Sequence, residues 1–325
     1  GSEGGGTPRL SRRQARRMTW GRARRRVGDH REGGALCTEH HGLVIARYGK
    51  EVDVLNPDHP DSTAQRCHLR AHLELVVGDR VLWQSAGAQG VVTAMAPRQS
   101  MLRRRERNGV RVLAANVDQI VLVVAPQPEP HASLVDRFLA AAELEGIQAL
   151  LVVNKSDLPG PEKVYCLVHT RARLGYPMIQ VSAQDGTGVD ALRQHLTGRI
   201  SVFCGQSGVG KSSLINRIFP AARAAVGQLS AAAVKGRHTT TIARFYPLPD
   251  GAVIDSPGIR EFDVPCDDAE QLIRGFVELR ALAGECRFRN CRHRDDPGCA
   301  ITTALAQGLI DRERLASFHQ LLLPD

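Results

Sequence analysis

The fold class of this 325-residue chain is decided by Gly205-Gln206-Ser207-Gly208-Val209-Gly210-Lys211-Ser212. This stretch fits the phosphate-binding loop pattern, with the apolar run Ile200–Cys204 before it and a helical pattern from Ser213 after it. In such a loop, glycines turn backbone N–H groups toward phosphates and the helix N-terminus adds its dipole. Lys211 can then reach the terminal phosphates, and Ser212 can ligate Mg²⁺. The alternative is a glycine-rich connector that merely ends in Lys-Ser.

Apolar runs and helical patterns alternate on both sides of this loop. Strands are expected at residues 119–125, 148–153, 178–181, 200–204 and 252–254, and helices at 134–144, near 189–196 and from 211. Such an alternation predicts a parallel sheet covered by helices on both faces. From about residue 267 helical patterns dominate, and the chain ends in a helix near 311–322. An α/β domain followed by a mainly α-helical domain is therefore expected.

A second motif indicates which base is bound. Asn154-Lys155-Ser156-Asp157 follows the apolar run 150–153, which places it at the sheet edge where ligands bind. The carboxylate of Asp157 can accept hydrogen bonds from the ring N–H and the amine of guanine, whereas adenine offers no matching pair of donors. We assign Asn154 and Lys155 to the same base site, together with Ser182 and Ala183, which can offer a backbone N–H to the guanine oxygen. A polar loop after a strand is the alternative.

Two further segments are candidates for binding Mg²⁺ and the γ-phosphate. Asp255 leaves the apolar strand 252–254 and can hold the metal, while Gly258 can offer its N–H to the γ-phosphate. Between the loop and this strand lies the sequence GRHTTT, residues 236–241. The Thr240 hydroxyl is predicted to complete the Mg²⁺ coordination, with the neighbouring threonines as alternatives.

The position after this Asp-x-x-Gly segment is informative for catalysis. Ras-like enzymes place a Gln there to orient the attacking water, but this chain has Ile259, which carries no polar group. Slow intrinsic hydrolysis is therefore expected. His238 is the local candidate for positioning water, with Lys211 and Thr240 acting on the phosphates. An exposed histidine with no catalytic role is the alternative for His238.

The order of these motifs along the chain is itself informative. An ordinary GTPase runs from the phosphate loop through the Thr and Asp-x-x-Gly segments to Asn-Lys-x-Asp and Ser-Ala, whereas here the last two come first. The sequence therefore predicts a circularly permuted domain, joined at Thr197–Arg199. Such a cut is tolerated because the termini of compact domains often lie close together. We interpret the permutation as a way to couple the segment after Asp255–Gly258 to the bound nucleotide. A permutation with a purely structural role is the alternative.

A metal site is predicted in the segment that follows. Cys286, Cys291, His293 and Cys299 offer three thiolates and an imidazole within 14 residues, which is a closed tetrahedral set for one structural zinc ion. Buried free thiols beside an exposed histidine are the alternative. Four arginines, at 287, 289, 292 and 294, interleave these ligands, so the site also presents positive charge.

The N-terminal third predicts a small β-barrel and carries two basic regions. Short β-rich runs are expected as strands at residues 42–48, 51–54, 73–77, 80–83 and 90–95. Six arginines follow between 98 and 111, while residues 1–32 hold ten arginines and a net charge of +7 out of +9 for the whole chain. An oligonucleotide-binding (OB-fold) barrel and an RNA-binding arm explain this charge. A spacer barrel and a solvated tail are the alternatives.

Composition limits the class of protein. A hydrophobic fraction of 42% with 24% charge excludes wholesale disorder, and no apolar run approaches the roughly 20 residues that cross a bilayer. The arginine-rich start also lacks the apolar segment of a secretory signal. A cytoplasmic protein with no membrane partner is expected.

Together these motifs resemble the bacterial small ribosomal subunit biogenesis GTPase family, RsgA or YjeQ. The resemblance rests on Asn154–Asp157 preceding Gly205–Ser213, the HTTT segment 238–241, Asp255–Gly258 and the Cys/His set after them. It implies an OB-fold barrel, a permuted GTPase domain and a zinc domain that grip the small subunit and its rRNA near the decoding region. It further implies late-stage maturation, in which the subunit stimulates hydrolysis of GTP to GDP and phosphate, and hydrolysis releases the factor.

The expected organisation is a basic extension over 1–36, a barrel over 37–112, the permuted GTPase domain over 113–266 and the zinc domain over 267–325. The cofactors are one zinc ion and Mg²⁺ with GTP or GDP, and a monomer is expected. Two rival functions stay open. One is a nucleotide-gated RNA-binding module with vestigial hydrolysis, and the other is a kinase for a small nucleotide, which the Asn-Lys-Ser-Asp motif opposes.

Overall fold

The computed structural model describes residues 38–56, 63–70, 72–87, 89–106, 109–160, 162–220, 244–248, 251–255, 264, 268–294 and 296–322. The chain divides into two compact units, Gly1–Glu39 and His40–Asp325. The arginine-rich extension, residues 1–36, lies outside the described residues. The helices and strands described below belong to the second unit. The one exception is Glu39, the first residue of the first strand, which falls in the first unit.

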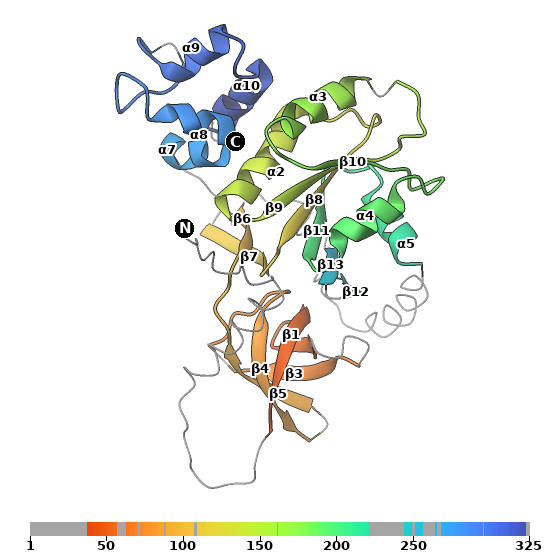
Figure 1. Ribbon diagram of the computed structural model, residues 1–325. Helices are drawn as coiled ribbons and strands as arrows, with labels where there is room; N and C mark the ends of the chain where they lie inside the picture. The colour runs from red at the N-terminus through yellow and green to blue at the C-terminus, as the bar shows by residue number, and fades with distance from the viewer. Residues whose placement is uncertain are drawn as a thin grey trace, which may run out of the picture. The chain divides into compact units, whose positions relative to one another are not determined.

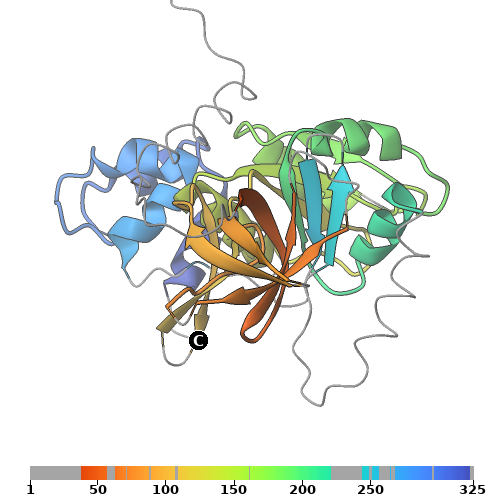
Figure 2. The ribbon, with the colours of Figure 1, turned by 90° about the horizontal axis from the view of Figure 1, so that it is seen from below.

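The first element is a closed five-stranded barrel (Figures 1 and 2). Its strands are β1 (Glu39–Tyr48), β2 (Glu51–Leu55), β3 (Gln65–Leu69), β4 (Arg80–Ala86) and β5 (Gln89–Met95), in the order β1-β2-β3-β5-β4. Inward side chains alternate with outward ones along β1, as a strand that buries one face requires. The core is formed by Val44, Val52, Val54, Cys67, Leu75, Val81 and Val92. The predicted barrel is confirmed.

The third strand is not the one that the apolar pattern predicted. Residues 73–77 form only an isolated bridge, from Val77 to Ala114, whereas β3 pairs antiparallel with β2 and parallel with β5. The β3 sequence QRCHL has one fully buried apolar side chain, Cys67, and Leu69 is only partly buried against the same core. Leu75 is also fully buried and fills the same core. The apolar pattern therefore indicated that these side chains are buried. Side chains of a loop that packs over a barrel are buried just as those of a strand are.

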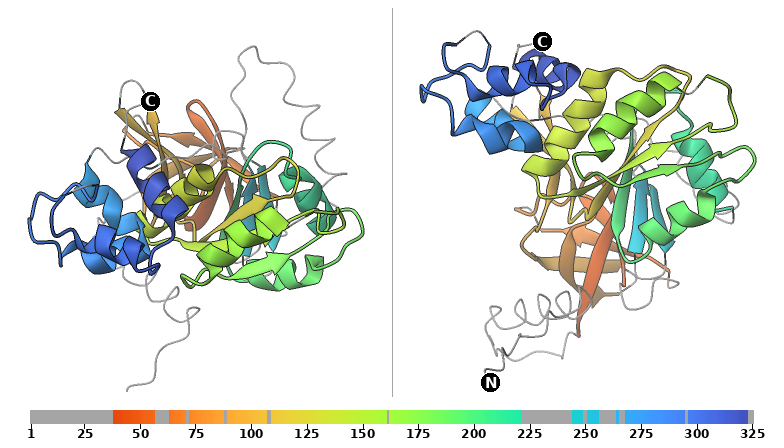
Figure 3. Two further views of the ribbon diagram at one scale, coloured as in Figure 1. Left: turned by 90° about the horizontal axis from the view of Figure 1, so that it is seen from above. Right: turned by 45° about the horizontal axis from the view of Figure 1, so that its top comes forward.

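A six-stranded sheet follows, in the order β10-β9-β8-β11-β13-β12 (Figure 1), and helices cover both of its faces (Figure 3). Its strands are β8 (Gln119–Val124), β9 (Gln148–Val153), β10 (Met178–Gln180), β11 (Ile200–Cys204), β12 (Arg244–Leu248) and β13 (Gly251–Asp255). All neighbours pair in parallel except β12 and β13, which are antiparallel. The helices α2 (Ala132–Leu144) and α3 (Glu162–Ala172) pack on one face. The helices α4 (Val189–Leu196) and α5 (Lys211–Ile218) pack on the other, so the predicted α/β architecture is confirmed.

Most of the second basic cluster lies on a hairpin of its own. Strands β6 (Met101–Glu106) and β7 (Gly109–Ala115) form a separate two-stranded sheet that carries Arg103, Arg104, Arg105 and Arg111. The hairpin is anchored through Leu102 and Ala114, which are fully buried in the core on the α2 face of the large sheet.

The C-terminal lobe is helical, as predicted, and comprises α7 (Ala269–Leu272), the 3₁₀ turn η2 (Ile273–Gly275), α8 (Val277–Ala283), α9 (Ala300–Ala306) and α10 (Arg312–Leu321). The carboxylates of Asp268 and Asp311 accept the N–H of Gln271 and Arg314 and so cap α7 and α10. Within the described residues, no helix has the length and apolar character needed to span a membrane.

Four charged residues join this lobe to the large sheet, and we call Asp136, Arg171, Glu278 and Arg314 the buried ion cluster. Three of them are buried, and the side chain of Glu278 is 11% exposed. Asp136 Oδ2 lies 2.8 Å from Arg171 Nη2, and Asp136 Oδ1 lies 2.9 Å from Arg314 Nη1. Arg314 Nε lies 2.6 Å from Glu278 Oε1. Burial opposes the charge of Arg314, but its bonds to Glu278 and Asp136 outweigh this effect and raise its pKa. The cluster therefore links α2, α3, α8 and α10.

Candidate nucleotide site and metal centre

The phosphate-binding loop joins β11 to α5, and two of its glycines have no substitute. Gly205 has φ +127°, and a Cβ there would lie 2.2 Å from the carbonyl oxygen of Val123. Gly210 has φ +94°, and a Cβ there would lie 2.4 Å from Asn154 Nδ2. Both positions combine a left-handed backbone with close approach of a neighbour, which only glycine allows.

Lys211 lies across this loop. Its side chain is buried, with the residue 6% exposed, and Nζ donates to the carbonyl oxygens of Gly205 at 2.7 Å and Gln206 at 2.6 Å. The ammonium and the first turn of α5 therefore concentrate positive potential at the loop. Ser212 and Ser213, in that first turn, are exposed.

Asn154 ties the loop to the two segments predicted to bind the base. It lies at the end of β9 and is 1% exposed. Its Nδ2 donates to the carbonyl oxygen of Val209 at 2.8 Å, and its Oδ1 accepts the N–H of Ala183 at 3.1 Å. The phosphate loop, the 154–157 segment and the 182–183 segment are thus brought together by one side chain. Motif matching assigned Asn154 to the base site without showing this bridging contact.

Asp157 is exposed, yet its carboxylate is held in place. The buried hydroxyl of Ser182 donates to Asp157 Oδ1 at 2.7 Å and accepts the N–H groups of Gln184 and Asp185, both at 3.2 Å. Lys155, with φ +59°, donates from Nζ to the carbonyl oxygen of Gln127 at 2.8 Å. The role of the Ser182 side chain was missed from the sequence, where only a backbone N–H of that segment was considered.

Asp255 ends β13, which pairs in parallel with β11, so it lies at the same edge of the sheet as the phosphate loop. It is 7% exposed. The other residues predicted for this side of the site, His238, Thr240 and Gly258, lie outside the described residues, as does Ile259.

The predicted metal ligands come together in the C-terminal lobe. The ligand atoms of Cys286, Cys291, His293 and Cys299 all lie within 4.8 Å of one another. Nδ1 of His293 lies 3.5 Å from Cys286 Sγ and 3.7 Å from Cys299 Sγ. These separations suit donors placed about 2.0–2.3 Å from one tetrahedral ion.

Helices α9 and α10 hold this cluster in shape. Cys299 precedes α9, and its Sγ accepts the N–H of Thr302 at 3.4 Å. The ring of Phe318 packs 6.3 Å from that of His293, and His319 Nε2 lies 2.9 Å from the His293 carbonyl oxygen. His293 itself has φ +58° and lies between the second and third sulfur ligands, Cys291 and Cys299. The site is closed by protein on the α10 side.

Comparison with known proteins gives a consistent result. Residues 95–265 match the family model RsgA GTPase. The chain is 49% identical over 305 residues to the small ribosomal subunit biogenesis GTPase RsgA of Pseudomonas aeruginosa strain LESB58, covering 91% of this chain and 89% of the relative. It is 49% identical over 307 residues to the protein of that name from Azotobacter vinelandii, with the same coverage.

Two solved structures are similar over most of the chain. YjeQ from Thermotoga maritima has a TM-score of 0.71 at 29% identity, covering 89% of this chain and all of that one. YloQ, described as a circularly permuted GTPase, has a TM-score of 0.68 at 26% identity, covering 90% and 96%.

Proposed function

Because the chain belongs to the RsgA GTPase family, we propose that it hydrolyses GTP late in small-subunit maturation, bound to rRNA near the decoding region. Hydrolysis to GDP and phosphate is stimulated by the subunit and coupled to release of the factor. The chain acts in the cytoplasm as a monomer. The contact that supports the proposal most is the Asn154 bridge, which joins the base segments to Val209 of the phosphate loop, 55 positions along the chain.

Asp157 is proposed to select guanine. Its carboxylate is fixed by the Ser182 hydroxyl and remains exposed, so it can accept the ring N–H and amine of the base. Asn154 then acts by positioning the base and phosphate segments, because its side chain accepts the N–H of Ala183 and donates to the carbonyl oxygen of Val209.

Exchanging Asp157 for asparagine is expected to move selectivity from GTP to xanthosine triphosphate, because an amide offers the complementary pair of groups. We expect GTP affinity to fall about 10²-fold or more, as sites built around substrate hydrogen bonds do when a pair is lost. Competition binding with the two nucleotides measures this change. Retained preference for GTP would exclude Asp157 from base recognition, and Asp190→Asn on the exposed surface of α4 is the matched control.

Lys211, Ser212, Thr240 and Asp255 are proposed to bind the phosphates and Mg²⁺. Hydroxyl and carboxylate oxygens are the ligands that Mg²⁺ prefers, and Asp255 and Ser212 lie at the same sheet edge. When bound, the ion neutralises charge on the β- and γ-phosphates. Backbone N–H groups from Gly205 to Ser213, with that of Gly258, complete the phosphate site.

Cys286, Cys291, His293 and Cys299 are proposed to hold one structural zinc ion. Three sulfurs and one imidazole nitrogen form the soft, closed donor set that zinc takes in structural sites. The lobe around them consists of short helices, so a metal crosslink contributes directly to its folding.

Coupling between the nucleotide and the C-terminal lobe is supported by the course of α2. Pro130 and His131, just before α2, line a small cavity with Gly205 and Gln206 of the phosphate loop. Asp136, one turn further on, belongs to the buried ion cluster that holds α8 and α10. One helix therefore touches both the phosphate loop and the lobe.

His238 is proposed to position the attacking water.

An RNA-binding module with vestigial hydrolysis is the second candidate, because Ile259 offers no polar group where Ras-like enzymes have Gln. Turnover that rises with small subunits favours the proposed enzyme over this module.

A further inference from the structure

The loop between the first two metal ligands, Arg287–Asn290, carries an unusual side chain at its surface. Phe288 is 47% exposed, and it is the only aromatic residue among the exposed large hydrophobic residues of the described chain. Single exposed apolar residues are common and need no explanation alone. Phe288, however, lies on a constrained loop and among positive charges, and this combination is typical of a binding surface.

This loop is held at both of its ends by neighbouring parts of the lobe. It is bounded by Cys286 and Cys291, whose sulfurs both belong to the metal cluster. The N–H of Cys291 donates to the Phe288 carbonyl oxygen at 3.3 Å, and the N–H of Arg287 donates to the Gly298 carbonyl oxygen at 3.0 Å. The ring is therefore presented on a short turn that backbone hydrogen bonds hold at both ends, so little conformational entropy is lost when it binds a partner.

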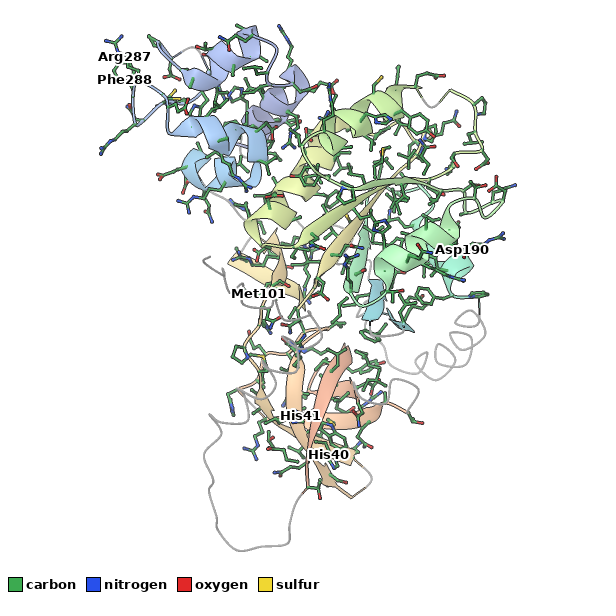
Figure 4. The ribbon with its side chains drawn as sticks, viewed as in Figure 1. His40, His41, Met101, Asp190, Arg287 and Phe288 are labelled. Atoms are coloured by element: carbon green, nitrogen blue, oxygen red, sulfur yellow. The ribbon has the colours of Figure 1, made fainter. Side chains whose placement is uncertain are left out.

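Positive charge surrounds the ring. The guanidinium carbon of Arg287 lies 5.4 Å from the Phe288 ring centroid, and both side chains project outward from the loop (Figure 4). Arg289, Arg292 and Arg294 are also exposed, and in the described part of the chain none of these four arginines forms an ion pair. The loop thus combines one flat aromatic face with several cations that form no ion pair with the described residues.

We propose that this loop binds RNA by stacking Phe288 on an unpaired nucleobase, with the flanking arginines on the adjacent phosphates. The inference rests on the proposed function and adds the chemistry of one contact. A base offers a π-face to the ring, and the nucleic-acid backbone offers anionic phosphates to the arginines. An apolar protein partner would need a wider hydrophobic patch, whereas Phe288 is the only exposed large hydrophobic residue of this loop.

The test compares Phe288→Ala and Phe288→Tyr with the wild-type chain in binding to purified small ribosomal subunits. Because stacking on one base is worth roughly 1–3 kcal/mol by alanine substitution, the alanine variant is expected to bind about 5- to 150-fold more weakly. Stacking involves no counterion, so the slope of log affinity against log salt should stay unchanged in Phe288→Ala but fall by about 1 in Arg289→Ala. The tyrosine variant should bind within about twofold of wild type, since it keeps the aromatic face.

Leu309→Ala is the matched control, because Leu309 is 72% exposed in the same lobe and lies outside the loop. It should leave affinity unchanged, and melting temperatures should agree among all variants. Chemical probing of the subunit RNA should show one unpaired base protected by wild type and Phe288→Tyr and reactive with Phe288→Ala. Unchanged affinity of Phe288→Ala would refute the stacking inference, and so would weaker binding with no base changing its reactivity, which would indicate a protein contact. No binding by the wild-type chain would refute the proposed function itself.

Discussion

Replacing Lys211 with alanine is expected to lower GTP turnover by at least about 10²- to 10³-fold, the effect of losing one donor that stabilises developing charge in a closed site. The ammonium lies 2.6–2.7 Å from two loop carbonyl oxygens and is almost fully buried, so it is held where a terminal phosphate would approach. In that position its charge is poorly screened, and no neighbouring lysine of the loop can replace it.

The measurement is phosphate release at saturating GTP, with nucleotide affinity measured in parallel. Lys163→Ala is the control, because Lys163 is 81% exposed and pairs with the exposed Glu129. The control should keep wild-type turnover. Turnover of Lys211→Ala within tenfold of wild type would contradict the assignment of Gly205–Ser213 as the phosphate site.

The second large effect is expected from Asp136→Ala, which removes the acceptor shared by two guanidinium groups. Asp136 and Arg171 are fully buried and Arg314 is 1% exposed. Among the described residues, Arg171 would keep only the exposed Glu313 as a carboxylate partner, and Arg314 would keep only Glu278. Breaking a buried ion pair by removing one partner costs about 3–5 kcal/mol of stability. We expect the free energy of unfolding, measured in urea, to fall by a corresponding amount. The C-terminal lobe should also separate from α2 at a lower urea concentration.

Glu313→Ala separates this effect from simple loss of an acidic residue. Glu313 lies 3.7 Å from Arg171 but is 66% exposed, so its removal should cost no more than about 1 kcal/mol. Equal stabilities for the two variants would show that the buried ion cluster does not hold the lobe. Hydrogen exchange in α8 and α10 reports the same difference locally.

Local motifs predicted much of the site. The phosphate loop, the Asn154–Asp157 segment and the four metal ligands each fall within a few residues, and the structure brings each set together. The permuted order was also evident from the sequence, and the likeness to YloQ agrees with it. These features were predictable because the chemistry requires particular residue types at fixed spacing.

Contacts between distant segments were not predictable. Asp136 and Arg314 meet across 178 positions, and nothing in either helical pattern shows that their charges are buried together. The Ser182 hydroxyl bond to Asp157 likewise depends on how two loops cross. The third barrel strand was misplaced for a related reason, since Leu75 is buried in the barrel core without belonging to a strand of that barrel.

The most direct test of the proposed function is GTP turnover at fixed enzyme concentration, measured alone, with purified small ribosomal subunits and with large subunits. We predict slow turnover alone, a large increase with small subunits and no increase with large ones, because a partner must supply what Ile259 does not. Tight GTP binding with no stimulation by small subunits would contradict the account and favour an RNA-binding module.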